Sequence, residues 1–157
     1  MAAETTSQAR SLVWHGAMLV LLGLISGFTT LFAKVPATAL SAHTIGVLQG
    51  AVLFGLAGAW HLIRGSALTL RIAKYTIVIG FYANWLGVQL AAFWSAGRSM
   101  FSVSGTNMPE GAAGWMNVLV MFLLNVSMLV MVTCVIILWC SRKSRGVTTG
   151  NVPSGER

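Results

Sequence analysis

Acidic residues are nearly missing from this chain of 157 residues, which has three glutamates and no aspartate. Charged residues make up 8% of the sequence, whereas soluble domains carry roughly 25%. Glu4 and Glu156 lie in the polar ends of the chain, which leaves Glu110 as the one acidic residue between them. This composition argues against a soluble enzyme and against ordinary carboxylate catalysis.

Other functional signatures are absent as well. Proton-coupled transport usually needs an intramembrane carboxylate, so a proton-driven transporter is disfavoured. The sequence has no phosphate-binding glycine loop, no HExxH motif and no cysteine cluster. Cys134 and Cys140 are six residues apart on one predicted helix, about 120° around its axis, and cannot pair with each other. In so apolar a chain, the net charge of +7 indicates basic residues that orient the protein at an anionic lipid surface, and it does not indicate nucleic-acid binding.

Long apolar segments dominate what is present. Four charge-free stretches each exceed the length of about 20 residues that crosses a bilayer, and they show no strand-like alternation. The sequence therefore predicts an all-α integral membrane protein, a bundle of four transmembrane helices. The predicted membrane domain is 12–141, between a cytoplasmic tail 1–11 and a basic flexible tail 142–157, with spans at 12–33, 40–63, 75–97 and 115–140.

The basic residues are distributed unevenly around these spans. Eight of the ten flank one side, and Lys34 and Arg98 flank the other. By the positive-inside rule, both termini are expected to be cytoplasmic, in a bacterial-type inner membrane that the chain crosses several times. An alternative is a secretory signal peptide cleaved after Ala37-Thr38-Ala39, but the apolar run is longer than the roughly 7 to 15 residues of a signal peptide.

Polar residues inside a membrane are costly and are therefore functional candidates. The second span opens with Ser41, a plausible helix N-cap, and continues with His43. Gly46 and Gly50 leave a flat strip beside this histidine, where either a neighbouring helix or a planar cofactor could lie. In the third span Asn84 needs a partner, from another helix or a ligand.

The remaining polar residues suggest a neutral aromatic pocket. Tyr82 and Gln89 share a helix face, and Trp85 is either a pocket wall or a lipid-facing residue. Asn117 and Asn125 in the fourth span are expected to form interhelical hydrogen bonds. A pocket of this kind suits an apolar aromatic substrate, and a histidine could hold haem iron with an open position that acts as a Lewis acid.

Several stretches resemble hydroxylaminobenzene mutases. They are Trp14-His15-Gly16 with the following Leu-Leu-Gly-Leu-Ile-Ser-Gly, the segments 40–50 and 90–97, and Tyr82-Ala-Asn-Trp-Leu. The chain is similar, more remotely, to styrene oxide isomerase, a four-helix trimeric membrane enzyme whose haem b is bound by a histidine at the start of its second helix. The matching residue here is His43.

The resemblance implies an isomerase that converts an arylhydroxylamine, such as hydroxylaminobenzene, into 2-aminophenol. It implies ferric haem b on His43 and a homo-oligomer, with a trimer favoured. As catalytic candidates, Asn84 and Gln49 would orient the polar group of the substrate and Tyr82 would help to enclose its ring. Trp85 and Gln89 are the substrate-binding candidates.

The chain departs from styrene oxide isomerase at three positions. Gln49 replaces an asparagine, and Gly80 and Val88 stand where that enzyme has an acidic residue and a tyrosine. These differences favour the mutase over epoxide isomerisation, which remains an alternative. Two further alternatives are a cytochrome b electron carrier with His15 and His61 as iron ligands, and a membrane protein without enzymatic activity.

Overall fold

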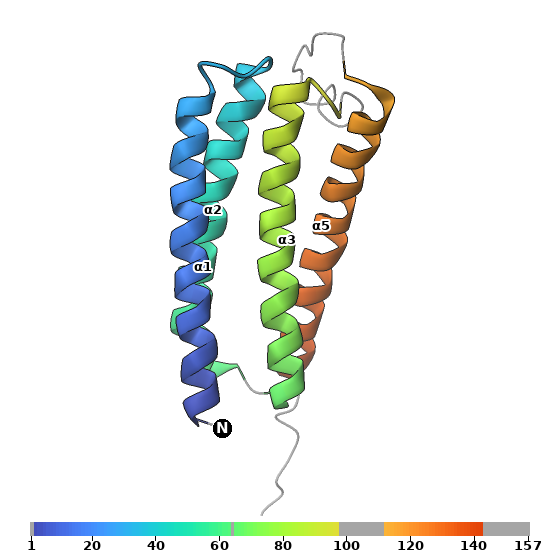
Figure 1. Cartoon of the computed structure of the whole chain (residues 1–157). Helices are drawn as coiled ribbons and strands as arrows, with labels where there is room; N and C mark the ends of the chain where they lie inside the picture. The colour runs from blue at the N-terminus through green and yellow to red at the C-terminus, as the bar shows by residue number, and fades with distance from the viewer. Residues whose placement is uncertain (1, 64, 98–111, 143–157) are drawn as a thin grey trace, which may run out of the picture.

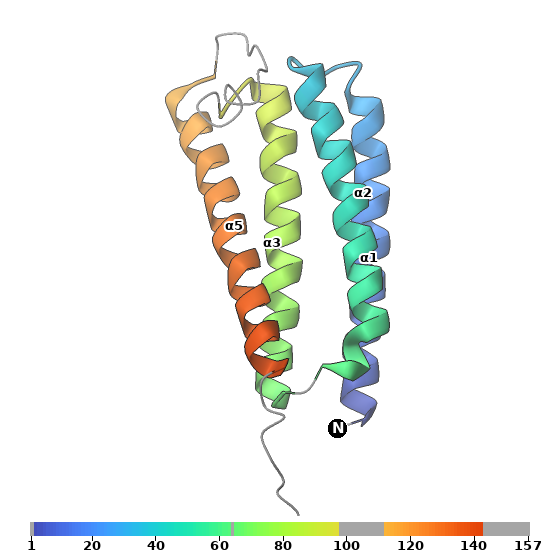
Figure 2. The same ribbon diagram turned by 180° about the vertical axis from the view of Figure 1, so that it is seen from behind.

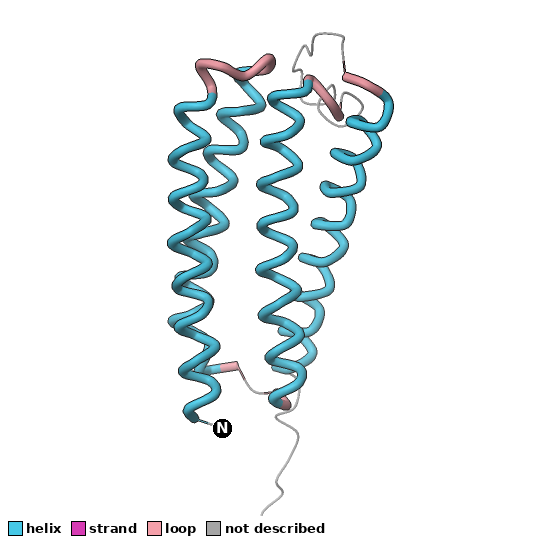
Figure 3. Tube along the Cα trace, viewed as in Figure 1, coloured by secondary structure: helices cyan, strands magenta, loops and turns pink. Residues whose placement is uncertain are grey.

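Four long helices form the protein, seen in a computed structural model that describes residues 2–63, 65–97 and 112–142 (Figure 1). The helices are α1 (Ala2–Thr29), α2 (Pro36–Ala59), α3 (Ala67–Trp94) and α5 (Gly114–Arg142), and a short 3-10 helix, η1 (Trp60–Leu62), follows α2. The described ranges contain no strand (Figure 3). All four helices are long and apolar enough to span a membrane. The prediction of an all-helical, multi-pass membrane protein is confirmed.

Helices α1 and α2 start earlier than the sequence predicts. Helix α1 begins at Ala2, so the segment 2–11, predicted to be a tail before the first span, is part of the helix. Helix α2 begins at Pro36, where a missing backbone N–H costs nothing at the first helical position. Ser41 is therefore not an N-cap, because it lies inside the helix and its hydroxyl donates to the carbonyl oxygen of Ala37, 3.1 Å away.

Helix α3 also starts earlier than predicted. Ser66 caps it by accepting a hydrogen bond from the backbone N–H of Thr69 at 3.1 Å. Arg71 and Lys74 consequently lie in the first turns of this helix, and the third span includes a lysine, contrary to the prediction. The half-buried Lys74 extends over the ring of Tyr75, with Nζ 4.4 Å from the ring centroid. The segments 98–111 and 143–157, which include Arg98, Glu110 and most of the predicted basic tail, lie outside the described residues.

The helices form two antiparallel pairs, α1 with α2 and α3 with α5, which Figures 1 and 2 show from opposite sides. Helix α2 joins the pairs by packing on α3, and α1 meets α3 over a smaller area. Helix α5 packs chiefly against α3, and its outward side presents large apolar side chains. The fold is thus a bundle in which α3 is the central element.

Glycines bring α1 and α2 into close contact. A Cβ atom added at Gly46 would lie 2.7 Å from the Cα atom of Gly23, and one added at Gly50 would lie 2.7 Å from the carbonyl oxygen of Gly16. Small residues permit this close approach of backbones within a membrane. Helix α1 therefore occupies the strip beside Gly46 and Gly50 that the sequence left open to a helix or a planar cofactor.

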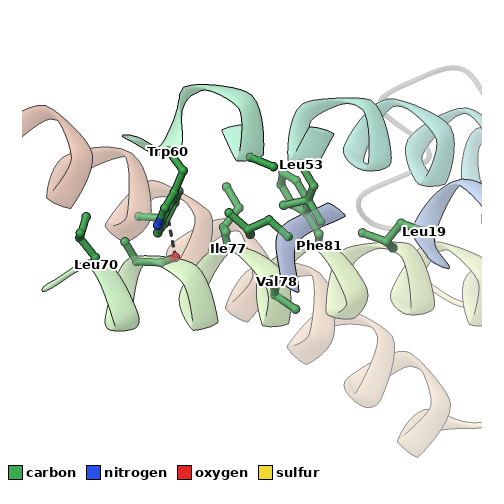
Figure 4. Packing of buried hydrophobic residues seen from close by; sticks show 11 residues of the cluster. Leu19, Leu53, Trp60, Leu70, Ile77, Val78 and Phe81 are labelled. Carbon is green, nitrogen blue, oxygen red and sulfur yellow. Dashed lines mark hydrogen bonds between the residues drawn. The ribbon is translucent and has the colours of Figure 1, made fainter. Parts of the chain in front are cut away.

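The main apolar core is formed by residues of all four long helices and η1 (Figure 4). Trp60 is fully buried there, on the side of the cluster with Leu70 and Ile77 (Figure 4), and its indole N–H donates to the side-chain oxygen of Gln8 at 3.2 Å. This contact explains why α1 extends into the polar start of the chain. Cys134 is buried in the same core and Cys140 is exposed. Both are free thiols, as predicted.

Candidate functional site

His43 is held in one orientation by α1. Its Nδ1 atom lies 2.8 Å from the carbonyl oxygen of Gly23, and a carbonyl only accepts hydrogen bonds. Nδ1 therefore carries the proton, and in the neutral imidazole the lone pair is on Nε2. Gly27 leaves room for the ring, because a Cβ atom at that position would lie 3.1 Å from Nδ1. The arrangement suits Nε2 for binding a metal.

Gln49 lies on a different face of α2. Six residues separate it from His43, which corresponds to about 240° of rotation. Its face includes Ala42 and Ile45, which pack in a cluster with Val88 of α3. Gln49 is buried, and its Oε1 atom has no hydrogen-bond partner among the described residues. The structure therefore does not bring these two predicted site residues together within one chain.

Two hydrogen-bonded pairs join α1 to α3, and we call them the α1–α3 ladder. The indole N–H of Trp85 donates to the hydroxyl of Ser26 at 3.0 Å. The side-chain nitrogen of Gln89 donates to the hydroxyl of Thr29 at 2.8 Å. Both hydroxyls are themselves donors to α1 backbone carbonyls. Trp85 is thus a partner of α1 rather than a lipid-facing side chain.

Tyr82 lies on the same face of α3 and contacts His15. The Nδ1 atom of His15 lies 3.3 Å from the Tyr82 hydroxyl, and the two rings meet edge to face with centroids 5.8 Å apart. Both side chains are half-buried. His15 is therefore a bonded partner of a predicted site residue.

His61 is exposed in η1, next to the inward-facing Trp60. Trp60 is bonded to Gln8, and Gln8 precedes His15 by roughly 10 Å along α1 at 1.5 Å per residue. His61 therefore lies near the level of Gln8 and not of His15, so the arrangement does not support one iron bound by both His15 and His61. No group of three or more His, Cys, Asp or Glu side chains in the described ranges could hold a metal ion.

Asn84 lies on another side of α3, toward α5. Its Oδ1 atom is 3.5 Å from the hydroxyl of Ser127, which also lies 2.8 Å from the carbonyl oxygen of Leu124. A single hydroxyl proton favours the shorter contact. The helix partner expected for Asn84 exists, but the bond is weak and leaves most of the amide's hydrogen-bonding capacity for a ligand.

The two asparagines of α5 behave differently from each other. Asn117 accepts a hydrogen bond from the backbone N–H of Gly97 at 2.9 Å, which ties α5 to the end of α3. Asn125 is exposed and donates to the carbonyl oxygen of Met121 in its own helix. Asn117 therefore connects α5 to the segment that follows α3, which meets the expectation only in part. For Asn125 the expected bond between helices is wrong, because its contact is within α5.

The structure groups the predicted site residues by helix face. Tyr82, Trp85 and Gln89 face α1, whereas Asn84 faces α5 and His43 lies between α2 and α1. Ser26 and Thr29 of α1 are the partners of Trp85 and Gln89, and they were not identified as candidates from the sequence. The available signal was two hydroxyl residues three apart in the first span, which places them on one helix face.

Comparisons with known proteins bear out the resemblance noted in the sequence. A family model described as styrene oxide isomerase matches residues 8–142. Hydroxylaminobenzene mutase HabB of Ectopseudomonas oleovorans is 32% identical over 146 residues, covering 93% of this chain and 88% of that protein. Hydroxylaminobenzene mutase HabA of the same organism is 33% identical over 89 residues, covering 57% of this chain and 66% of that protein.

No solved structure matches the chain significantly. The family match nevertheless extends over all four helices, and the similarity to HabB over nearly the whole chain. The four-helix membrane protein described above therefore belongs to the styrene oxide isomerase family, and its own similarity to hydroxylaminobenzene mutases indicates an isomerase.

Proposed function

We propose that this protein is a membrane-bound mutase, an intramolecular transferase that rearranges an arylhydroxylamine such as hydroxylaminobenzene to 2-aminophenol. In this reaction the hydroxyl oxygen leaves nitrogen and bonds to the ortho carbon of the ring. That carbon loses a proton and nitrogen gains one, so the reaction needs no external oxidant or reductant. The printed names of both relatives support this substrate class.

The observation that carries the proposal is the orientation of His43. Its Nδ1 proton is bonded to Gly23, which leaves the Nε2 lone pair as the one that would hold the iron of haem b. Ferric haem bound there would supply a Lewis acid for a substrate oxygen. The backbone carbonyl of Gly23 would fix the ring orientation and increase the basicity of Nε2.

The other residues act on the substrate itself. Asn84 and Gln49 are the amides that would orient the polar group, and each has hydrogen-bonding capacity that its helix neighbours leave unused. Tyr82 and Trp85 would enclose the aromatic ring and stabilise positive charge that develops on it. Gln89 would contact the substrate beside them.

We also propose that the working form is a homo-oligomer, with a trimer favoured by the family resemblance, embedded in a bacterial inner membrane with cytoplasmic termini. The described basic residues support this orientation. Arg10 lies in the first part of α1, and Arg71 and Lys74 lie in the first turns of α3. Both helices begin at the same end of the bundle, whereas the connection from α1 to α2, which contains Lys34, lies at the opposite end (Figure 1). The exposed apolar side chains of α1 and α5 suit contact with lipid or with another copy of the chain.

An absorption spectrum of the detergent-purified protein tests the proposal. The wild type should show a Soret band that shifts with hydroxylaminobenzene, and it should form 2-aminophenol. His43→Ala should lose the band and the activity, while the exposed His61→Ala should retain both. Turnover by a haem-free wild-type protein would reject the cofactor, and a haem band that survives in His43→Ala would reject the ligand.

Epoxide isomerisation is a second candidate, favoured by the family model itself. Supplying styrene oxide in place of hydroxylaminobenzene separates the two. Efficient isomerisation of the epoxide with no conversion of the arylhydroxylamine would replace the mutase assignment.

A further inference from the structure

Two consecutive hydrogen bonds involving α1 determine which end of the Gln89 amide, nitrogen or oxygen, faces α1. The Thr29 hydroxyl lies 2.7 Å from the carbonyl oxygen of Ser26 and donates its single proton there. It then offers only lone pairs to α3 and accepts from the Gln89 side-chain nitrogen at 2.8 Å. Turning the amide over would place two acceptors against each other, so Nε2 stays on the α1 side.

The opposite end of this amide is an unused acceptor. Gln89 is 8% exposed, and its Oε1 atom is buried with no hydrogen-bond partner among the described residues. The other pair of the α1–α3 ladder leaves no polar atom unused on α3, because the indole of Trp85 has a single N–H group and Ser26 accepts its hydrogen bond. A buried carbonyl left without a donor destabilises the protein. A hydrogen bond from a bound molecule to Gln89 Oε1 would remove this cost.

The surroundings indicate which kind of molecule supplies the donor. Tyr82 and Trp85 precede Gln89 by seven and four residues and therefore share its helix face. On α2, which packs on α3, the Oε1 atom of Gln49 is a second amide oxygen that is buried without a partner among the described residues. An aromatic molecule that carries N–H or O–H groups matches this set, whereas an epoxide offers only an acceptor oxygen.

We infer that the side-chain oxygen of Gln89 accepts a hydrogen bond from the N–H or O–H group of the substrate, and that this contact selects aromatic hydroxylamines and amines over epoxides. The inference rests on the proposed function for the identity of the substrate. Thr29 acts as a positioning residue, because it holds the amide with its oxygen directed away from α1.

Binding of two inert ligands to the full-length protein tests the selection without any turnover. Aniline carries N–H donors, and N,N-dimethylaniline has the same ring without them. Equilibrium dialysis should show that the wild type prefers aniline by roughly three- to tenfold, the factor for one hydrogen bond. Gln89→Met, which keeps the side-chain length, should remove this preference.

Thr29→Val should reduce the preference as well, because the amide is then free to turn. Thr133→Val is the matched control, since Thr133 is exposed on α5 and its hydroxyl donates to the carbonyl oxygen of Leu129 in its own helix. A preference for aniline that persists in Gln89→Met, as expected if only water occupies the oxygen, would overturn the inference. So would a wild type that binds both ligands equally.

Failure of the proposed function has a different signature. A wild type that prefers aniline, loses that preference in Gln89→Met, and forms no 2-aminophenol from hydroxylaminobenzene would leave the donor selection intact and reject the mutase activity. Turnover in the wild type with an unchanged ligand preference in Gln89→Met would do the reverse.

Discussion

The Nδ1 atom of His43 donates a hydrogen bond to the carbonyl oxygen of Gly23, 2.8 Å away on the neighbouring helix. Gly23 has this role because the backbones of α1 and α2 are in contact at that level. A Cβ atom added at Gly23 would lie 2.7 Å from the backbone nitrogen of Val47. The glycines that join the two helices therefore also determine which nitrogen of His43 carries the proton. Helix packing and the chemistry of the candidate site are coupled at one residue pair.

The glycine contact predicts a stability difference between two alanine substitutions in α2. In Gly46→Ala the new Cβ atom would lie 2.7 Å from the Cα atom of Gly23, and overpacking of this kind costs roughly 1–3 kcal/mol. Gly55→Ala is the matched control, because a Cβ atom there meets nothing within 4 Å. Thermal unfolding in detergent should show a lower Tm for Gly46→Ala only. Equal Tm values for both variants would contradict the close α1–α2 contact.

The contact between Gln8 and Trp60 predicts a cost for removing one partner. Gln8→Leu leaves the buried indole N–H without an acceptor, which should lower the free energy of unfolding by about 1–3 kcal/mol. Adding Trp60→Phe removes the unpaired donor, so the loss in the double variant should be smaller than the sum of the two single losses. Strictly additive losses in denaturation experiments would show that this segment of α1 does not pack on Trp60.

The pair formed by Tyr82 and His15 predicts an effect on turnover. Tyr82→Phe keeps the ring but removes the hydroxyl that lies 3.3 Å from His15. The loss of this positioning bond should lower kcat/KM for hydroxylaminobenzene by roughly three- to tenfold, with the haem absorption unchanged. Tyr75→Phe is the control, since Tyr75 is exposed on the same helix. If both variants lose activity equally, Tyr82 has no specific role.

Asn84 and Asn125 form another matched pair. Among the described residues, Asn84 has the long contact to Ser127 as its one side-chain hydrogen bond. Asn84→Leu should therefore cost little stability but lower kcat/KM by about tenfold or more, since a buried substrate group loses its partner. Asn125→Leu should leave kcat/KM unchanged, because Asn125 is bonded within its own helix. Steady-state kinetics and a thermal melt of each variant separate the two effects. An inactive Asn84→Leu protein that also unfolds early would indicate a structural role.

The number and type of the membrane spans were determined by the sequence alone. Hydropathy over about 20 residues is a local property, and the four apolar stretches identify the four helices. Helical periodicity placed Tyr82 and Gln89 on one face, and the glycine spacing of α2 indicated close packing. The polar start of the chain was misjudged as a tail, because the burial of Gln8 depends on its bond to Trp60, 52 residues away.

Only the tertiary structure decided which side chains meet across helices. The rotation and axial offset of α1 against α3 pair Ser26 with Trp85 and Thr29 with Gln89, and neither quantity can be derived from the sequence of one helix. The offset of α1 against α2, which is set by glycine contacts, gives His43 its acceptor at Gly23. Composition and periodicity are sufficient for the spans, but the direction of each hydrogen bond depends on how the helices pack.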